Sequence, residues 1–409
     1  MRILFCGDSP TVDTGFGVVA GNILTRLQDM GHEIYAMGIN YYGEPYDHQK
    51  FSFPIWPVDK GSLDAMYGYQ KFWYIEEQVK PDLIFFLNDP WVIEKYLSLR
   101  PQTTDRYTKM IAYYPTDSGP MKPEWVKMLG EFDAQVCYSN FAERVLIESN
   151  NNKRPKNLHQ IYHGVDINTF HPVVQAEARI NLGLPVDAFI VGMVARNQYR
   201  KRFDLLCKAF ADFAKDKDNV KLYLHTSLHD VGFNIEDMTR QLDIQDKLIL
   251  TEDLAANKGV PAHVLNLIYN SFDVNALISM GDGFGLPVAE SMATGCPQLV
   301  SGHSCLQELV EGHGGLTVKT AAWMMNTGGF NTWGGLSDVE DITAKLNVLH
   351  GSRDLRMELS QQAFDFITQE QFSWDYAANE FDKIIKKIFH VWEVKNGSSD
   401  KRIADINAA

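Results

Sequence analysis

The chain has 409 residues, of which 45% are hydrophobic and 22% are charged, and its formal net charge at pH 7 is −14. This length exceeds what one hydrophobic core usually supports, so it predicts a globular protein of two domains. The negative charge disfavours a general nucleic-acid-binding or anionic-membrane-binding surface.

The N-terminus and the cysteines favour a cytoplasmic protein. Residues 1–6 have the pattern of a buried strand and lack the charged leader and long apolar stretch of a signal peptide. The five cysteines are odd in number and never spaced as Cys-x-x-Cys, so we expect reduced thiols rather than disulfides or a zinc site. The longest apolar runs are far shorter than the roughly 20 residues of a membrane-spanning helix, so no integral membrane association is expected.

Strand-like and helical patterns alternate through the first part of the chain. Residues 2–7 predict a strand, 16–30 a helix that ends at Gly31, and 33–39 a second strand. Further strand-like runs follow at 81–88, 109–115 and 134–140, and the last of them leads into a helix over 142–149. This alternation predicts a parallel sheet covered by helices.

A second alternation of the same kind begins after residue 172. Its predicted strands cover 189–195, 220–226, 247–250, 273–279 and 297–301. Its predicted helices cover 203–215, about 235–242, 263–271 and a segment that starts at Pro287. Two such series predict an α/β protein of two doubly wound, Rossmann-like domains that face each other across a cleft.

The domain boundaries follow from these patterns. We expect a first domain over 1–165 plus 375–409, a second domain over 166–374, and a hinge near 164–172. The amphipathic helix predicted over 373–394 would cross back to the first domain. The first segment, 1–165, has 16 Lys and Arg against 20 Asp and Glu, whereas 166–374 has 16 against 26, so most of the acidity lies in the second domain.

The stretch Gly281–Glu290, GDGFGLPVAE, predicts a turn from a strand into a helix. Gly283 and Gly285 lack a Cβ, so a ligand could approach the backbone, and Pro287 suits the first helical turn. The unpaired N–H groups of that turn favour an anion such as phosphate.

The two acids of this stretch suit a ligand with hydroxyl groups on both sides of a phosphate. Glu290 could accept hydrogen bonds from a ribose, and Asp282 could reach a second polyhydroxy group, so a nucleotide-sugar would occupy the whole motif. The alternative is a tight turn followed by an acid that the helix dipole favours. The residues alone support both interpretations equally.

Basic residues cluster after the predicted strand 189–195, where parallel sheets bind ligands and where cations would neutralise phosphate. They are Arg196, Arg200, Lys201 and Arg202. Arg200 and Arg202 can equally form a solvated surface, and no role is assigned to them.

From residue 160 onward the chain resembles the retaining glycosyltransferases of family 4, in the glycogen synthase-like superfamily with the GT-B fold. In that family two glutamates with seven residues between them enclose Gly-Phe-Gly-Leu-Pro, and here the frame is Asp282, seven residues and Glu290. The segment IYHGVDINTFHP is similar to the family's interdomain segment, with His163 in place of the usual Asn.

The resemblance implies which residues of the second domain bind the donor. Arg196 and Lys201 would bind its diphosphate and stabilise the leaving group. The loop that cradles the donor would consist of Gly283, Phe284, Gly285 and Leu286, with Glu290 on the ribose and Asp282 among the catalytic residues.

In the first domain, DTGFGVVAGN is similar to the family's glycine-containing loop beside the diphosphate and acceptor, which assigns substrate binding to Gly15, Phe16 and Gly17. The same residues fit Gly-x-Gly-x-x-Ala, so a dinucleotide-dependent oxidoreductase is an alternative. Against it, residues 8–14 separate the strand from the first glycine, and no acid follows the strand 33–39 to hold a ribose.

Asp117, in YYPTDSGP, is the counterpart of the family's His-Asp-type segment at the cleft, although the His is absent. Its predicted catalytic role is to orient the acceptor hydroxyl or the donor sugar. A plain turn at the end of a strand is the alternative.

The resemblance implies a retaining, metal-independent hexosyl- or pentosyltransferase without a cofactor, for which we expect a UDP-sugar as donor substrate. The acceptor could be a glycan, a lipid, a small metabolite or a modified DNA base, and the acidity of the chain disfavours DNA. The alternative from another functional class is a non-catalytic nucleotide-sugar-binding protein.

Overall fold

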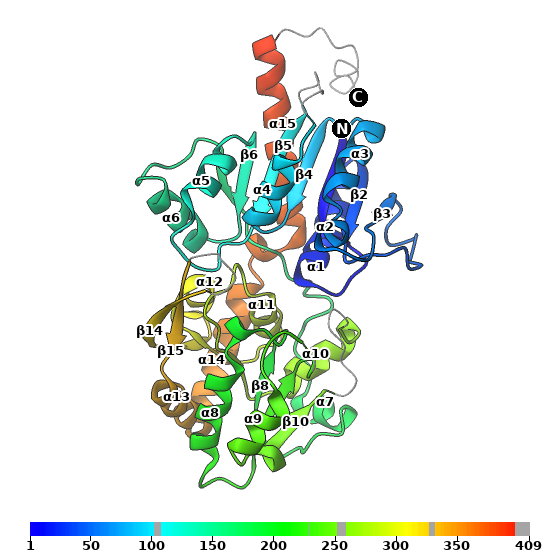
Figure 1. The fold of residues 1–409 in the computed structure, drawn as a ribbon. Coiled ribbons are helices and arrows are strands. Elements are labelled where there is room, and N and C mark those ends of the chain that lie inside the picture. Colours follow the sequence, from blue (N-terminus) through cyan, green and yellow to red (C-terminus); the bar gives the residue numbers. More distant parts are fainter. Residues whose placement is uncertain (102–107, 229, 252–258, 327–331, 397–409) are drawn as a thin grey trace.

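The computed structural model describes residues 1–101, 108–228, 230–251, 259–326 and 332–396. These residues form two parallel sheets, each covered by helices and seen as upper and lower lobes in Figure 1. The prediction of two doubly wound α/β domains is therefore confirmed. The last residues assigned to the first domain, 397–409, lie outside the described part of the chain.

The first sheet has the strand order β3-β2-β1-β4-β5-β6-β7, with all neighbours parallel. Its strands are β1 (Arg2–Asp8), β2 (Glu33–Ile39), β3 (Ile55–Pro57), β4 (Leu83–Leu87), β5 (Lys109–Tyr114), β6 (Ala134–Cys137) and β7 (Leu158–Gln160). The helices of this part are α1 (Gly15–Asp29), α2 (Leu63–Tyr67), α3 (Tyr69–Val79), α4 (Pro90–Ser98), α5 (Pro123–Gly130) and α6 (Asn140–Ser149).

The second sheet has the order β10-β9-β8-β11-β12-β13, again with all neighbours parallel. Its strands are β8 (Phe189–Val194), β9 (Val220–His225), β10 (Leu248–Leu250), β11 (Val274–Leu277), β12 (Gln298–Ser301) and β13 (Gly315–Val318). The helices that follow β7 are α7 (Gln175–Asn181), α8 (Phe203–Ala214), α9 (Ile235–Gln241), α10 (Ala262–Ser271), α11 (Leu286–Ala293), α12 (Ser304–Val310), α13 (Val339–Gly351), α14 (Arg353–Ile367) and α15 (Trp374–Asn396).

In both sheets the strand order reverses beside the first strand, between β1 and β4 and between β8 and β11. Open parallel sheets bind ligands at the carboxyl ends of the strands on either side of such a reversal. The topology therefore directs attention to the loops after these four strands.

An antiparallel hairpin, β14 (Thr320–Met325) with β15 (Trp333–Ser337), was not predicted from the sequence. It reaches the first domain, because the backbone N–H of Trp333 donates to the carbonyl of Gly119 at 2.8 Å. The sequence between and around the two strands, 326–335, is rich in glycine, and residues 327–331 lie outside the described part.

The predicted return of the last helix to the first domain is confirmed. In Figure 1 α15 runs from the lower lobe into the upper one, and it packs along α1. Arg26 of α1 pairs with Asp375 at 2.6 Å, and His32 contacts Asp382 at 3.0 Å. The ring of Phe381 lies 5.0 Å from that of Phe85 in β4.

The chain crosses between the two sheets at two adjacent points. The N–H of Val165 donates to the carbonyl of Phe372 at 2.8 Å, so the two crossings run side by side. Gly164 has no room for a side chain, because a Cβ there would lie 2.3 Å from the backbone nitrogen of Trp374. The predicted hinge segment, near 164–172, begins at this crossing.

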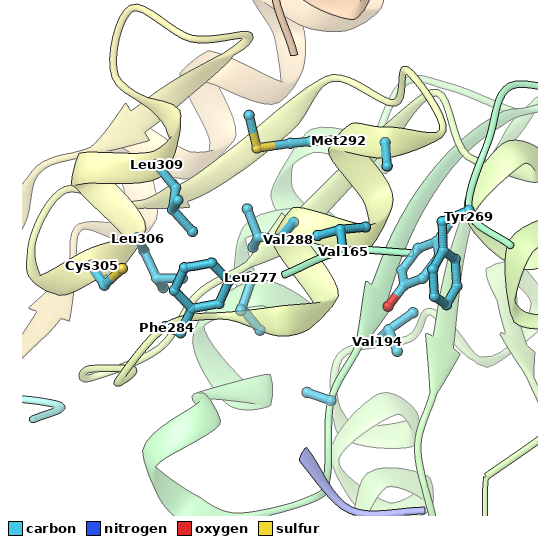
Figure 2. Close-up of a cluster of buried hydrophobic side chains, with 14 of the residues drawn as sticks. Val165, Val194, Tyr269, Leu277, Phe284, Val288, Met292, Cys305, Leu306 and Leu309 are labelled. Atoms are coloured by element: carbon cyan, nitrogen blue, oxygen red, sulfur yellow. The ribbon is translucent and has the colours of Figure 1, made fainter. Parts of the chain in front are cut away.

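The hydrophobic core continues through this crossing into the second domain. Figure 2 shows Val165 in a cluster with side chains from β8, α10, β11, α11 and α12, such as Tyr269, and with Phe284 of the loop before α11. All five cysteines are buried and free, as expected from their spacing.

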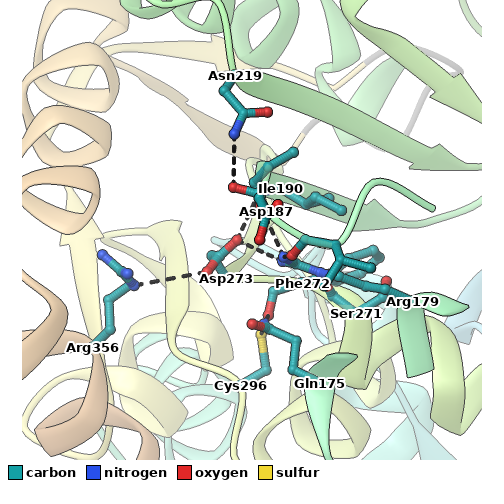
Figure 3. A network of polar contacts seen from close by, with 12 residues as sticks. Gln175, Arg179, Asp187, Ile190, Asn219, Ser271, Phe272, Asp273, Cys296 and Arg356 are labelled. Atoms are coloured by element: carbon teal, nitrogen blue, oxygen red, sulfur yellow. Dashed lines mark hydrogen bonds and ion pairs between the residues drawn. The ribbon is translucent and has the colours of Figure 1, made fainter. Parts of the chain in front are cut away.

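A buried polar network ties together the opposite end of the second sheet (Figure 3). Asp273, just before β11, pairs with Arg179 of α7 at 2.7 Å and accepts from the N–H of Ile190 at 2.8 Å. Arg179 also donates to the backbone carbonyls of Ser271, Val186 and Ala188. Because it joins the amino ends of β8 and β11, this network stabilises the domain and lies away from the ligand-binding end.

Among the described residues, no helix is long and apolar enough to cross a membrane.

We expect Phe381→Ala to lower the free energy of unfolding by about 3–5 kcal/mol, because it removes a fully buried ring between α15 and the first sheet. Thermal and denaturant unfolding would measure the loss. The exposed neighbour Asn379→Ala serves as the control and should change stability by less than about 0.5 kcal/mol. Equal effects of the two substitutions would contradict the packing of α15 on the first domain.

Candidate functional site

The loops at the carboxyl ends of the two sheets meet, and they carry most of the predicted site residues. A Cβ on Gly281 would lie 2.2 Å from the carbonyl oxygen of Asp117, and one on Gly283 would lie 2.7 Å from the Cβ of Pro115. A Cβ on Gly15, at the start of α1, would lie 3.7 Å from the side chain of Leu286. The structure therefore brings together both predicted glycine loops and the turn that holds Asp117.

These distances give Gly283 a role other than the expected one, and Gly281, which was assigned no role from the sequence, shares it. The sequence suggested that a missing Cβ leaves room for a ligand. In the structure, the turn 115–117 of the first domain occupies that space. The two glycines are therefore required for the close approach of the domains.

Gly285 is the N-cap residue of α11. It has a φ of +95°, a conformation that favours glycine, and a Cβ at this position would also meet Leu306 at 2.7 Å. The helix begins directly afterwards at Leu286, with Pro287 in its first turn. Pro287 has no N–H, and the carbonyl of Gly285 already accepts from the N–H groups of Val288 and Ala289. It is therefore the positive end of the helix dipole that favours an anion at this end of α11.

Phe284 is an anchor for the loop. Its side chain is only 3% exposed, and Figure 2 shows the ring among Leu277, Leu306 and Leu309. The ring centroid lies 4.9 Å from that of His163, at the chain crossing. A ligand at this position could therefore contact only the backbone of Phe284.

Asp282 lies at the centre of a buried charge cluster. Its Oδ1 accepts hydrogen bonds from Lys201 Nζ at 2.5 Å and from Arg200 Nη1 at 3.0 Å. Burial alone would raise the pKa of Asp282, but the two cations hold it at about 2. Its Oδ2 is buried and has no hydrogen-bond partner among the described residues, so this oxygen can accept a hydrogen bond from a ligand hydroxyl.

Arg200 joins the two domains and was not assigned a role from the sequence. Besides its bond to Asp282, its Nη1 lies 3.5 Å from Oδ2 of Asp117 in the first domain. Burial raises the pKa of Asp117, whereas the guanidinium of Arg200 lowers it. The basic run 196–202 was the available signal, but only the fold shows which of its members reaches the first domain.

The remaining cations of this run have other partners. Arg196, 45% exposed, pairs with Asp230 through two contacts of 2.7 and 3.1 Å. Its guanidinium also lowers the pKa of Asp8, although burial has the larger, opposite effect. Arg202 pairs with Asp204 and lies outside the cluster around Asp282.

Two acids of the first domain were missed by sequence reasoning. Asp8 ends β1 and accepts hydrogen bonds from Thr14 at 2.5 Å and from Asn40 at 3.1 Å. Asp89 is the second residue after β4, and its pKa is raised to about 7 by burial and by the nearby charge of Asp117. Each acid comes at the end of a predicted strand, which is the signal that could have identified it.

The other predicted residues of the first domain lie at the start of α1. Gly15 is exposed and faces Leu286, whereas Phe16 is partly buried. A Cβ on Gly17 would lie 2.3 Å from the carbonyl oxygen of Val12, so this glycine shapes its own turn. Residues 9–14 separate β1 from α1, as expected from the sequence, which disfavours a dinucleotide fingerprint.

Glu290 lies in the first turns of α11, where one carboxylate oxygen accepts a hydrogen bond from Tyr269 Oη at 2.8 Å. Burial raises the pKa of Glu290 to about 7, an effect that the hydrogen bond from Tyr269 only partly offsets. The second carboxylate oxygen of Glu290 can still accept a hydrogen bond from a ligand hydroxyl.

Comparison with solved structures identifies the fold. The sucrose-phosphate synthase of Thermosynechococcus elongatus has a TM-score of 0.76 with 17% sequence identity, covering 96% of this chain and 100% of that one. Anabaena Alr3699/HepE in complex with UDP and glucose has a TM-score of 0.68 with 16% identity, covering 95% and 100%. The chain thus has the two-domain GT-B fold of these glycosyltransferases.

Sequence comparison finds its family match in the second domain. Residues 174–331 match the family described as "Glycosyl transferases group 1". Mannosylfructose-phosphate synthase of Agrobacterium fabrum is 31% identical over 164 residues, which are 40% of this chain and 36% of that protein. Alpha-monoglucosyldiacylglycerol synthase of Streptococcus pneumoniae is 24% identical over 331 residues, 73% of this chain and 71% of that protein.

A third relative, D-inositol 3-phosphate glycosyltransferase of Segniliparus rotundus, is 28% identical over 143 residues. The match covers 35% of this chain and 31% of that protein, so the chain spans about a third of the length of such relatives. The segment 174–331 is therefore similar in sequence to the group 1 glycosyltransferases, and the chain has the GT-B fold.

The raised pKa of Glu290 predicts a pH-dependent loss of stability. Its contribution to stability is full below the ordinary glutamate pKa and is lost as the pH rises through about 7, because the unfolded state ionises first. Relative to Glu290→Gln, the native protein should lose about 1–3 kcal/mol between pH 5 and pH 8. Thermal unfolding of both proteins across this range measures the difference, and parallel curves would contradict the assignment.

Proposed function

We propose that the protein is a retaining glycosyltransferase of family 4 that moves a sugar from a UDP-sugar to an acceptor hydroxyl. The observation that carries this proposal is the cluster of Lys201, Arg200 and Asp282 beside the N-terminus of α11, with Asp117 facing it from the first domain. The cluster combines a site for an anion with a carboxylate oxygen, Oδ2 of Asp282, that is free to accept a hydrogen bond from a sugar hydroxyl. A second carboxylate, that of Asp117, lies on the side of the domain that would bind the acceptor substrate.

The second domain, 166–374, would hold the donor. As the glycosidic bond breaks, negative charge develops on the leaving diphosphate, and Arg196, Lys201 and the backbone N–H groups around Gly283 to Leu286 would stabilise it. Lys201 gives only part of its donor capacity to Asp282, since an ammonium group has three N–H donors.

The two acids of the motif would bind the hydroxyl groups on either side of the diphosphate. The free Oδ2 of Asp282 would accept a hydroxyl of the donor sugar. Glu290, which is hydrogen-bonded by Tyr269, would accept a hydrogen bond from a ribose hydroxyl of the nucleotide. The bound UDP and UDP-glucose of the HepE structures support a UDP-sugar as the donor.

The first domain, 1–165 plus 375–409, would bind the acceptor. Asp117 would orient the attacking hydroxyl, and Gly15 would bring the start of α1 close to the donor loop. In front-face transfer the acceptor oxygen bonds to the anomeric carbon on the face from which the diphosphate leaves, so the configuration is retained. The leaving phosphate takes the proton of the acceptor hydroxyl. Closure of the domains excludes water and limits donor hydrolysis.

The acceptor class differs among the relatives. One is named for an inositol phosphate, one for mannosylfructose phosphate and one for a diacylglycerol lipid. We therefore propose a glycan, lipid or small-molecule hydroxyl as acceptor and leave its identity to experiment.

A screen of UDP-, GDP- and ADP-sugars tests the donor assignment. A bound UDP-sugar should raise the unfolding temperature, and UDP release should show turnover. Arg196→Ala and Lys201→Ala should each lower turnover by about 10²–10³-fold. Lys208→Ala, which removes an exposed cation of α8 paired with Asp212, is the matched control and should leave turnover unchanged.

Two outcomes of the screen would contradict the proposal. Near-native turnover of Arg196→Ala and Lys201→Ala would remove these residues from the mechanism. Binding of a nucleotide-sugar without release of nucleotide across a broad acceptor panel would instead support a non-catalytic binding protein.

The proposed leaving-group stabilisation by protein cations predicts turnover without a divalent metal. Initial rates measured with and without excess EDTA should agree within about twofold, since Arg196 and Lys201 supply the positive charge. Loss of activity in EDTA and recovery on adding Mg²⁺ or Mn²⁺ would contradict it.

A further inference from the structure

Glu308 of the second domain caps a helix of the first domain. It lies on α12, and its Oε1 accepts from the backbone N–H of Asn140 at 3.0 Å, while its Oε2 accepts from that of Phe141 at 2.7 Å. A third donor, the hydroxyl of Tyr162, reaches Oε1 at 2.5 Å from the segment that leads to the chain crossing. One carboxylate thus receives three hydrogen bonds from outside its own domain.

The arrangement satisfies groups that α6 cannot satisfy by itself. The first N–H groups of a helix have no intrahelical acceptor. The side-chain hydroxyl of Ser139, the N-cap residue, accepts from the N–H of Ala142 at 3.1 Å. The N–H groups of Asn140 and Phe141 point to Glu308 instead, and the positive end of the helix dipole adds to the attraction.

The same carboxylate is connected to the donor loop. The ring of Tyr162 lies 6.2 Å from that of Phe284, and Leu306, two residues before Glu308, fills the space that a Cβ on Gly285 would need. Helix α12 therefore packs against the loop that carries Asp282. A shift of Glu308 relative to α6 would also move this loop relative to Asp117.

We propose that Glu308 is a positioning residue that latches the two domains in the closed arrangement and thereby sets the register of Asp282 against Asp117. When the domains separate, water replaces the three donors, so the latch opens without leaving a buried charge unpaired. The effect of Glu308 on catalysis rests on the proposed glycosyl transfer, whereas its effect on domain closure does not depend on that function.

Two readouts separate the latch from a merely structural role. Exposed positions Glu148 of α6 and Glu340 of α13 are changed to Cys and labelled with a fluorophore pair; the five native cysteines are buried, so labelling is selective. Interdomain energy transfer is then compared in the native background and in Glu308→Ala, Glu308→Gln and Glu311→Gln. Glu311 lies just beyond the same helix, and its carboxylate accepts a hydrogen bond from the side chain of Gln307 of its own domain, which makes it the matched control.

We expect Glu308→Ala to widen the interdomain distance and to lower kcat about tenfold, while the Kd for UDP alone changes less than about twofold, because UDP contacts the second domain. Glu308→Gln, which keeps the size but loses the charge, should lie between Glu308→Ala and the native protein. Glu311→Gln should match the native protein in both measurements.

A native interdomain distance in Glu308→Ala would overturn the latch, whatever the activity. A widened distance with unchanged kcat would overturn its role in positioning the reacting groups. If Glu308→Ala does not fold, Glu308→Gln and Tyr162→Phe, which preserve the packing, provide the same comparison. Absence of any sugar transfer in the native protein would refute the proposed function and leave the distance test intact.

Discussion

The buried ion cluster around Asp282 is the interaction on which the arrangement of the cleft depends. A buried carboxylate is tolerated only when cations and hydrogen bonds compensate for its lost hydration. Lys201 and Arg200 provide that compensation on one oxygen, and Arg200 extends the cluster to Asp117 in the other domain. The domains can approach this closely because Gly281 and Gly283 have no side chains where the turn 115–117 lies.

Apolar packing holds this polar centre in place. Phe284 is buried between α12 and the chain crossing, so the backbone on both sides of it is fixed while Asp282 and the start of α11 face the cleft. The crossing itself is tight, because Gly164 lies against Trp374 and α15 continues into the core of the first domain. The rigid support and the charged site are therefore parts of one contact region, to which Glu308 adds a polar connection.

Much of the architecture followed from local patterns. Alternating strand and helix periodicities placed both parallel sheets, and the amphipathic stretch after residue 373 placed α15. The hairpin of β14 and β15 was missed, because Thr320–Met325 lacks the alternation of apolar and polar residues that marks a strand, although glycines follow it in the sequence. Arg200 and Glu308 were missed as contributors because their partners lie 82 and 167 residues away in the sequence.

The sequence by itself determined the two-domain class, the strand-to-helix turn at Gly281–Glu290 and the residues that could meet a diphosphate, because periodicity, glycine positions and charge are local properties. Only the tertiary structure decided which cation reaches the first domain, that Phe284 is an anchor, and that Gly281 and Gly283 make room for that domain. These depend on distances between segments far apart in the chain. Such distances arise from the packing of both domains together, which no local pattern contains.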